Sequence, residues 1–260
     1  CTAVESIKEY IRSGHSYQVN LSQRFSRPCA VDSFAIYKLL SHVNPVDFGA
    51  YFKFKDFALV CVSPERLFKK NNNIISTRPI AGTKKKSSED LNILKKQFLA
   101  DSKELSEHAM LVDLERNDLG RICKEGTVKI DSFCEIAEYT HVMHMESEVS
   151  GVLLDHTNFF DILKAVFPGG TITGVPKIRT MEIIAEFESY CRGFYTGSVG
   201  YVGYDNNMDF NIIIRSIICK DDIVHINVGG GITNKSCPEK EYQETLSKAY
   251  SQMLAVENLI

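Results

Sequence analysis

Two glutamate pairs have the residue type and spacing that metal chemistry needs. Glu104 and Glu107 stand three apart in one stretch of helical period, and Glu241 and Glu244 stand three apart in another, followed by Lys248. Residues three or four apart project from one side of a helix. Each pair alone is typical of a solvated acidic face. Brought together, four carboxylates would need a cation between them, and oxygen donors without His or Cys favour a hard ion such as Mg2+.

A glycine- and threonine-rich loop, Phe167–Glu182 (FPGGTITGVPKIRTME), could hold an anion. A helix predicted to begin at Pro176 would present N–H groups and its positive dipole end to a phosphate or carboxylate. The same stretch is equally consistent with a tight connection between packed elements. It lacks the Gly-Lys-Ser/Thr ending of a P-loop, which argues against a nucleoside triphosphate. The helix is expected to bury Ile178, Met181, Ile183 or Ile184, and Phe187.

Other polar residues stand where they could face a pocket. Gln18 lies in Tyr17–Phe25 (YQVNLSQRF), whose alternation predicts a half-buried strand, so Gln18 faces either a pocket or water. Glu65 opens a predicted strand and His144 lies within one, positions typical of a surface carboxylate and a structural histidine. Three glycines at residues 229–231 end another strand and allow backbone to approach a ligand closely.

An α+β fold would position these residues. The expected strands are 17–25, 49–54, 57–62, 66–70, 73–77, 127–133, 141–151, 197–204, 209–219 and 222–228, and the expected helices are 7–12, 34–42, 88–118, 158–167, the one from 176, and 238–259. Short turns between successive strands predict antiparallel pairing. We therefore expect a large, mostly antiparallel β-sheet system of two packed sheets covered by helices.

Composition is that of an ordinary globular protein. The chain has 260 residues, a net charge of −3 and no basic block beyond Lys84–Lys86, which argues against a nucleic-acid partner. No apolar run is long enough to span a bilayer, and no signal peptide opens the chain. Eight scattered cysteines predict reduced thiols in a cytoplasmic protein. We expect a single domain over residues 1–260, and a start at Cys1 suggests a fragment of something longer.

Several motifs, in order, carry a resemblance to a known family. They are Tyr17–Phe25 (YQVNLSQRF), Ser63–Arg66 (SPER), Arg78–Thr83 (RPIAGT), Leu111–Asp118 (LVDLERND), Phe167–Glu182, and Glu241–Thr245 (EYQET). Over essentially its whole length the chain resembles the chorismate-utilising enzymes, the family of anthranilate synthase component I and aminodeoxychorismate synthase component I. The resemblance implies the chorismate-binding enzyme fold. Family members usually carry a further N-terminal portion, which contributes sheet and, in anthranilate synthases, the tryptophan feedback site.

The resemblance also implies roles for single residues. For Mg2+ it implies Glu107 and Glu244 as ligands, with Glu104 and Glu241 acting through metal-bound waters. For chorismate it implies Lys248 and Thr171 at the ring carboxylate, and Tyr195, Arg215 and the N–H groups around Gly229 and Gly231 at the enolpyruvyl carboxylate. Glu65 would be the general acid at the C4 hydroxyl, and His144 an acid–base or positioning group near the ring.

The nucleophile implied by the resemblance is ammonia. Relatives that add water carry a lysine base where this chain has Gln18, and a glutamine cannot deprotonate water. The chain has no Cys-His-Glu glutaminase set of its own, so a glutamine amidotransferase partner is expected.

The branch of the family depends on conflicting signals. Ala81 stands where many aminodeoxychorismate synthases carry a lysine that attacks C2, and anthranilate synthases have alanine there. The motifs Phe167–Gly174, Met208–Ile212 and Thr196–Val199 resemble the aminodeoxychorismate branch instead, and we favour that branch. A non-catalytic chorismate-binding subunit is an alternative of another class. A calcium-binding structural protein is disfavoured because no EF-hand loop accompanies the paired glutamates.

Overall fold

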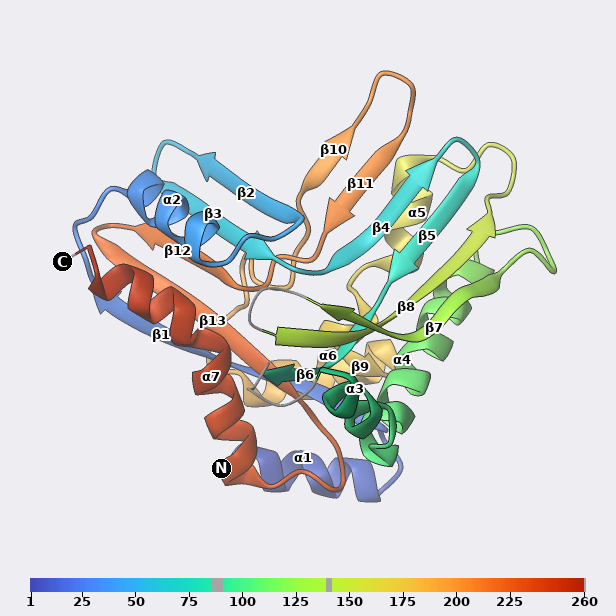
Figure 1. Cartoon of the computed structure of the whole chain (residues 1–260), viewed down its shortest axis with the longest axis horizontal. Coiled ribbons are helices and arrows are strands. Elements are labelled where there is room, and N and C mark those ends of the chain that lie inside the picture. Colours follow the sequence, from blue (N-terminus) through green and yellow to red (C-terminus); the bar gives the residue numbers. More distant parts are fainter. Residues whose placement is uncertain (86–90, 139–141, 260) are drawn as a thin grey trace. The chain divides into compact units, whose positions relative to one another are not determined.

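The computed structural model describes residues 1–85, 91–138 and 142–259. Ser88 and His141, where a predicted helix and strand begin, and Lys86 of the basic triplet lie outside these residues. The chain forms two compact units (Figure 1). Unit 1 comprises residues 1–64, 172–199 and 212–260, and unit 2 comprises residues 65–171 and 200–211.

Unit 1 is built on a six-stranded sheet with strand order β2-β3-β12-β13-β1-β9. Its elements are α1 (Thr2–Arg12), β1 (Gln18–Pro28), α2 (Ser33–Val43), β2 (Phe48–Lys53), β3 (Phe57–Ser63), β9 (Gly174–Val175), α6 (Lys177–Phe187), β12 (Ser216–Lys220), β13 (Ile223–Ile232) and α7 (Pro238–Glu257). Every strand pair in it is antiparallel, as the short turns predict.

The core of unit 1 lies between its sheet and two helices. Alternate residues of β13, namely Val224, Ile226 and Val228, are buried on the same side. They pack in one cluster with Ala249 of α7 and Leu40 of α2. Figure 1 shows α7, in red, running along β13. The even-numbered side of β13 therefore faces α7, which fixes the side to which Gly230 points.

Unit 2 is built on a second antiparallel sheet, with strand order β10-β11-β4-β5-β8-β6 and with β7 also paired to β8. Its elements are β4 (Arg66–Asn71), β5 (Ile74–Arg78), β6 (Ile80–Lys85), α3 (Leu91–Leu99), α4 (Ser102–Gly120), β7 (Lys129–Glu138), β8 (Val142–Val152), α5 (Phe159–Val166), β10 (Gly200–Val202) and β11 (Met208–Asn211). Helix α4 packs against β8 and β6, which positions its glutamates. The predicted fold class is confirmed: two antiparallel sheets with helices on them.

Three predicted elements differ from the structure. The stretch 88–118 holds two helices, α3 and α4, separated at residues 100–101. The stretch 209–219 holds two strands, β11 and β12, which belong to different sheets. Helix α6 begins at Lys177 with Pro176 as its N-cap, and Ile178 and Met181 are exposed at 77% and 46%, so their predicted burial is wrong. No helix among the described residues has the length and apolarity that crossing a bilayer requires.

Candidate active site

In unit 1, the acidic pair of α7 lies against the glycine segment of β13. A methyl group placed on Gly230 would stand 3.6 Å from Glu241 Oε2, 3.9 Å from Glu244 Oε1 and 3.9 Å from Lys248 Nζ. Lys248 Nζ forms an ion pair with Glu244 at 2.6 Å and donates to the Gly229 carbonyl at 3.1 Å. The predicted sharing of one helix side by these three residues is thus confirmed.

The glycine segment has an open backbone edge on the side of β12. Strand β12 pairs with β13 only from Ile223 to Ile226, so residues 229–231 extend past its end. The Gly229 carbonyl is available to Lys248 there. Within the described part of the chain, β12 does not pair with this segment, which suits a segment predicted to bind a carboxylate through its backbone.

Arg215 interacts both with the charged residues of α7 and with Tyr195 in unit 1. It has a positive φ of 51° at the point where the chain enters β12, and its Nη1 donates to the Lys248 carbonyl at 2.7 Å. Burial lowers the pKa of Arg215, while the nearby Tyr195 and Glu244 oppose that effect. Arginine stays protonated in proteins, so Arg215 is a partly desolvated cation held near Tyr195 and near Glu244 and Lys248 of α7.

On the opposite side of the glycine segment lie Gln18 of β1 and Tyr195 of the segment between α6 and β10. A methyl group on Gly231 would lie 2.8 Å from Gln18 Nε2, and one on Gly229 would lie 3.0 Å from the Tyr195 hydroxyl and 2.8 Å from Asn20 Oδ1. Gln18 and Tyr195 are 6% and 5% exposed. Burial raises the pKa of Tyr195, so its hydroxyl stays protonated and can donate. Gln18 therefore faces the protein interior, which resolves the alternative of a water-facing side chain.

In unit 2, predicted site residues gather around the start of β6. Glu65 is 5% exposed and accepts a long hydrogen bond of 3.5 Å from the Ile80 amide. His144 is 6% exposed, and its Nδ1 lies 3.3 Å from the Gly82 carbonyl. Gly82 has a positive φ of 64°, and a methyl group there would lie 2.6 Å from Glu104 Oε2. Only glycine fits this position, which brings Glu104 and His144 to one short backbone segment.

The remaining predicted residues of unit 2 lie on the same elements. Ala81 pairs with Met145 across β6 and β8. Glu107 is half-buried on α4, one turn from Glu104. Thr171 is half-buried in a short 3-10 helix, Gly170–Ile172. Gly170 packs so closely on Leu114 of α4 that a side chain there would overlap it.

The loop that links the units along the chain is a packed connection. The Asn20 amide donates to the Thr173 carbonyl at 2.7 Å, and Tyr17 N donates to Val175 O at 2.8 Å. Gly174 has a φ of 134°, and a side chain there would overlap the Gln18 carbonyl. These contacts establish the tight connection, and the anion-holding role of the loop stays a prediction.

The donor chemistry suits Mg2+ on each helix taken separately. Glu241 and Glu244 converge on Gly230, and Glu104 reaches Gly82 one turn from Glu107. Each pair offers the one or two carboxylates that Mg2+ usually takes. Among the residues that the structure describes, no group of three or more His, Cys, Asp and Glu side chains gathers as a metal site. The four-carboxylate arrangement therefore stays a prediction.

His108 was not expected from the sequence. It follows Glu107, is fully buried, and its Nε2 lies 2.6 Å from Ser147 Oγ of β8. Burial lowers the pKa of His108 to about 4, so the ring is neutral near pH 7. This contact ties the glutamate-bearing turn of α4 to β8. The only sequence signal for this contact is that His108 lies on the same side of the helix as apolar residues, where a polar side chain needs a buried partner.

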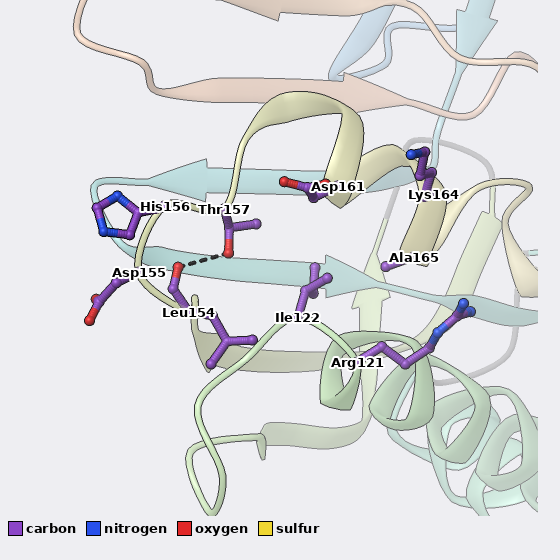
Figure 2. Close-up of a pocket in the computed structure, with 9 residues that line it drawn as sticks. All are labelled: Arg121, Ile122, Leu154, Asp155, His156, Thr157, Asp161, Lys164 and Ala165. Carbon is purple, nitrogen blue, oxygen red and sulfur yellow. Dashed lines mark hydrogen bonds between the residues drawn. The ribbon is translucent and has the colours of Figure 1, made fainter.

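A separate cavity of about 380 Å³ lies in unit 2 at the far end of α4 (Figure 2). Its residues are Arg121, Ile122, Leu154, Asp155, His156, Thr157, Asp161, Lys164 and Ala165. The carboxylates at its rim are already engaged, because Asp155 pairs with Lys124 at 2.9 Å and Asp161 accepts from the Asn158 amide at 3.0 Å. None of the predicted site residues lines this cavity.

Comparisons with known proteins agree with the fold. A family model described as chorismate binding enzyme matches residues 1–254. Aminodeoxychorismate synthase component 1 of Bacillus subtilis (strain 168) is 48% identical over 257 residues, covering 98% of this chain and 55% of that protein. Anthranilate synthase component 1 of Aquifex aeolicus (strain VF5) is 44% identical over 256 residues, covering 98% of this chain and 52% of that protein.

A solved structure shows the same likeness. The crystal structure of anthranilate synthase component I from Streptococcus pneumoniae TIGR4 matches with a TM-score of 0.90 and 39% identity, covering 96% of this chain and 56% of that one. The chain therefore spans about half the length of the relatives it matches.

Proposed function

Because this chain belongs to the family of chorismate-binding enzymes, we propose that it is the catalytic portion of an aminodeoxychorismate synthase component I. It would aminate chorismate at C4 with ammonia from a glutamine amidotransferase subunit, in the route to para-aminobenzoate and folate. The observation that carries this proposal is the convergence of Tyr195, Glu244 and Lys248 on the glycine segment of β13, with Arg215 bonded to the Lys248 carbonyl beside them. A substrate with two carboxylates needs such fixed cations and donors. The scattered cysteines, all free thiols, agree with a cytoplasmic location.

Carboxylate binding is the first task of these residues. Arg215 would meet the enolpyruvyl carboxylate with its planar fork, because its guanidinium is desolvated and its hydrogen bond to Lys248 O leaves further N–H donors. The protonated hydroxyl of Tyr195 and the backbone N–H groups around Gly229 and Gly231 would complete that contact. Lys248 would turn from Glu244 toward the ring carboxylate, with help from Thr171.

Mg2+ would be held by Glu107 and Glu244, with Glu104 and Glu241 acting through waters. Bound there, it would draw electron density toward the ring carboxylate and so favour loss of the C4 hydroxyl. This assignment predicts that turnover disappears in EDTA and returns with added Mg2+. Turnover that does not depend on Mg2+ would contradict this metal assignment.

Proton transfer falls to Glu65 and His144. Glu65 is buried beside the start of β6, and it would act as the general acid at the leaving C4 hydroxyl. His144 can bond the Gly82 carbonyl only as a donor, so Nδ1 carries a proton in that contact. The ring would act as an acid–base or positioning group near the substrate ring.

Ammonia is favoured as nucleophile because Gln18 faces inward at a point where a base would be needed for water. An amide cannot take a proton from water, whereas ammonia already has a free lone pair. Glutamine hydrolysis is assigned to a partner, and the component 1 names of the relatives support a second component.

The second candidate is anthranilate synthase component I, with amination at C2 and loss of pyruvate. Ala81 favours it, as do the relatives of that name at 42–44% identity. The Bacillus subtilis relative at 48% identity and the Phe167–Gly174 motif favour the C4 reaction. Chromatography of products from chorismate, ammonium and Mg2+ decides between them. Anthranilate formed without a lyase supports the C2 reaction, and para-aminobenzoate formed only with aminodeoxychorismate lyase supports the C4 reaction.

A further inference from the structure

Arg192 joins three segments of unit 1 through its side chain. Its Nη1 donates to the Ile172 carbonyl and its Nη2 to the Asn20 carbonyl, both at 2.7 Å. The same guanidinium makes two bonds to the Glu188 carboxylate, at 2.9 Å and 2.7 Å. The two side chains are only 14% and 6% exposed. One desolvated fork thus fixes β1 and the loop before β9 to the end of α6.

Glu188 extends this connection to the strand that faces the glycine segment. Its Oε1 accepts from both the amide and the hydroxyl of Ser22, each at 2.8 Å. Ser22 pairs with Gly229 and Asn20 pairs with Gly231 across β1 and β13. The Arg192–Glu188 pair therefore holds β1 at the two positions that pair with the glycines.

Tyr195 is held from the same residue. The Tyr195 amide donates to the Arg192 carbonyl at 3.1 Å, and the Arg192 guanidinium lies 5.9 Å from the centre of the Tyr195 ring. The next residue, Thr196, has a φ of 65°, and its hydroxyl accepts from Arg192 Nη1 at 3.5 Å. A left-handed conformation at a β-branched residue persists only where its surroundings fix it, and Arg192 is one of the groups that do so.

We propose that Arg192, held by Glu188, is a positioning residue for the carboxylate-binding end of the site. Arg192 holds both the turn that carries Tyr195 and the strand β1 that pairs with Gly229. It thereby sets the distance between the Tyr195 hydroxyl and the Gly229 backbone. This inference rests on the proposed function for its substrate, a molecule whose carboxylate binds to Tyr195 and the glycine segment. Arg192 itself donates inward to protein carbonyls and acts through Tyr195.

Substitutions separate positioning from simple stabilisation. Arg192→Met keeps much of the aliphatic stem but removes every donor, and it leaves Glu188 as a buried unpaired charge. The double variant Arg192→Met/Glu188→Leu removes that charge as well, which recovers the stability that the unpaired charge costs without restoring the bonds to Asn20 and Ile172. Lys8→Met is the matched control, because Lys8 is also a poorly exposed cation of unit 1 that donates to a loop carbonyl, Ser236 O, at 2.9 Å.

The kinetic readout is the Michaelis constant for chorismate at saturating ammonium and Mg2+. We expect Arg192→Met to raise KM about tenfold or more, because displacement of a binding group by about 1 Å can cost up to about a hundredfold. We expect kcat to change much less and Arg192→Lys to recover part of the loss. The double variant should have a higher urea midpoint than Arg192→Met while KM stays raised. A double variant whose KM returns to the wild-type value overturns the proposal, as does a KM unchanged in Arg192→Met.

A second readout needs no substrate. In protein labelled with 13C at tyrosine rings, the Tyr195 resonance is assigned by its loss in Tyr195→Phe. We expect this resonance to shift in Arg192→Met and in the double variant but to stay in place in Lys8→Met. An unshifted resonance in Arg192→Met overturns the positioning role. If the wild type does not consume chorismate, the proposed function fails, and the tyrosine spectrum still decides the role of Arg192.

Discussion

Gly229 and Gly230 are adjacent on β13, and the structure assigns them opposite responses to alanine. A methyl group on Gly229 would lie 2.8 Å from the Leu21 carbonyl, 2.8 Å from Asn20 Oδ1 and 3.0 Å from the Tyr195 hydroxyl. The first of these is backbone and cannot turn away. The nearest atoms to a methyl group on Gly230 stand at 3.6 Å or more, which is ordinary van der Waals contact.

The expected magnitudes follow from this geometry. Overpacking of this kind costs about 1–3 kcal/mol, so Gly229→Ala should lower the free energy of unfolding by about that amount. A methyl group on Gly230 would make only ordinary van der Waals contacts in an extended strand, so restricting the unfolded chain should stabilise the protein by about 0.4–1 kcal/mol. The free energies of unfolding of the two variants should therefore differ by about 1.5–4 kcal/mol.

The KM for chorismate should also distinguish the two variants, with Gly229→Ala again the more impaired. Gly229→Ala must displace β1 or the Tyr195 hydroxyl, so we expect the KM for chorismate to rise about tenfold, while Gly230→Ala stays within about threefold of the wild type. Urea denaturation and chorismate consumption at saturating ammonium measure both quantities. Equal stability and equal KM in the two variants would refute the assignment of Gly229 to a close contact between β1, β13 and Tyr195.

Three further predictions test other parts of the structure. Glu244→Gln should lower Mg2+-dependent turnover about a hundredfold or more, because it removes a proposed ligand and the partner of Lys248, and unchanged turnover over a Mg2+ titration would contradict the metal assignment. Asn158→Ala should cost about 1 kcal/mol in urea denaturation without changing KM, because the Asn158 side chain accepts from two amides at the start of α5. Cys123 should resist iodoacetamide at pH 8.5 while exposed Cys191 reacts, because burial raises the pKa of Cys123 to about 11 and a thiol below its pKa lacks the reactive thiolate. Mass spectrometry measures the order of alkylation, and alkylation of Cys123 before Cys191 would contradict the burial of Cys123.

Local sequence signals predicted the elements well where local chemistry decides them. Turn residues separate the strands of both sheets, and α7 begins at Pro238 as predicted. Local signals failed where one apolar run serves two sheets. Residues 209–219 read as one strand, yet the chain changes sheet within them and Arg215 takes a left-handed conformation. Nothing within that run distinguishes a continuous strand from two, because the change depends on which neighbours each half finds.

The same distinction applies to the site. Helical spacing alone placed Glu241, Glu244 and Lys248 on one side of α7, and the structure confirms it. The partners of Arg192 could not be predicted in that way. Its spacing from Glu188 suggests one ion pair. Its bonds to Ile172 and Asn20, however, span sequence separations of 20 and 172 residues respectively. Such contacts exist only once the sheet of unit 1 has formed.

The three glycines of β13 differ in what requires them, and this difference explains how one strand can serve two sets of polar side chains. Gly229 and Gly231 point to the side of the sheet where Tyr195 and Gln18 occupy the space that side chains would take. Gly230 faces α7, where only the ends of charged side chains approach. Arg215 is electrostatically coupled both to Tyr195 and to Glu244. A carboxylate bound at this backbone would therefore interact with both sides at once.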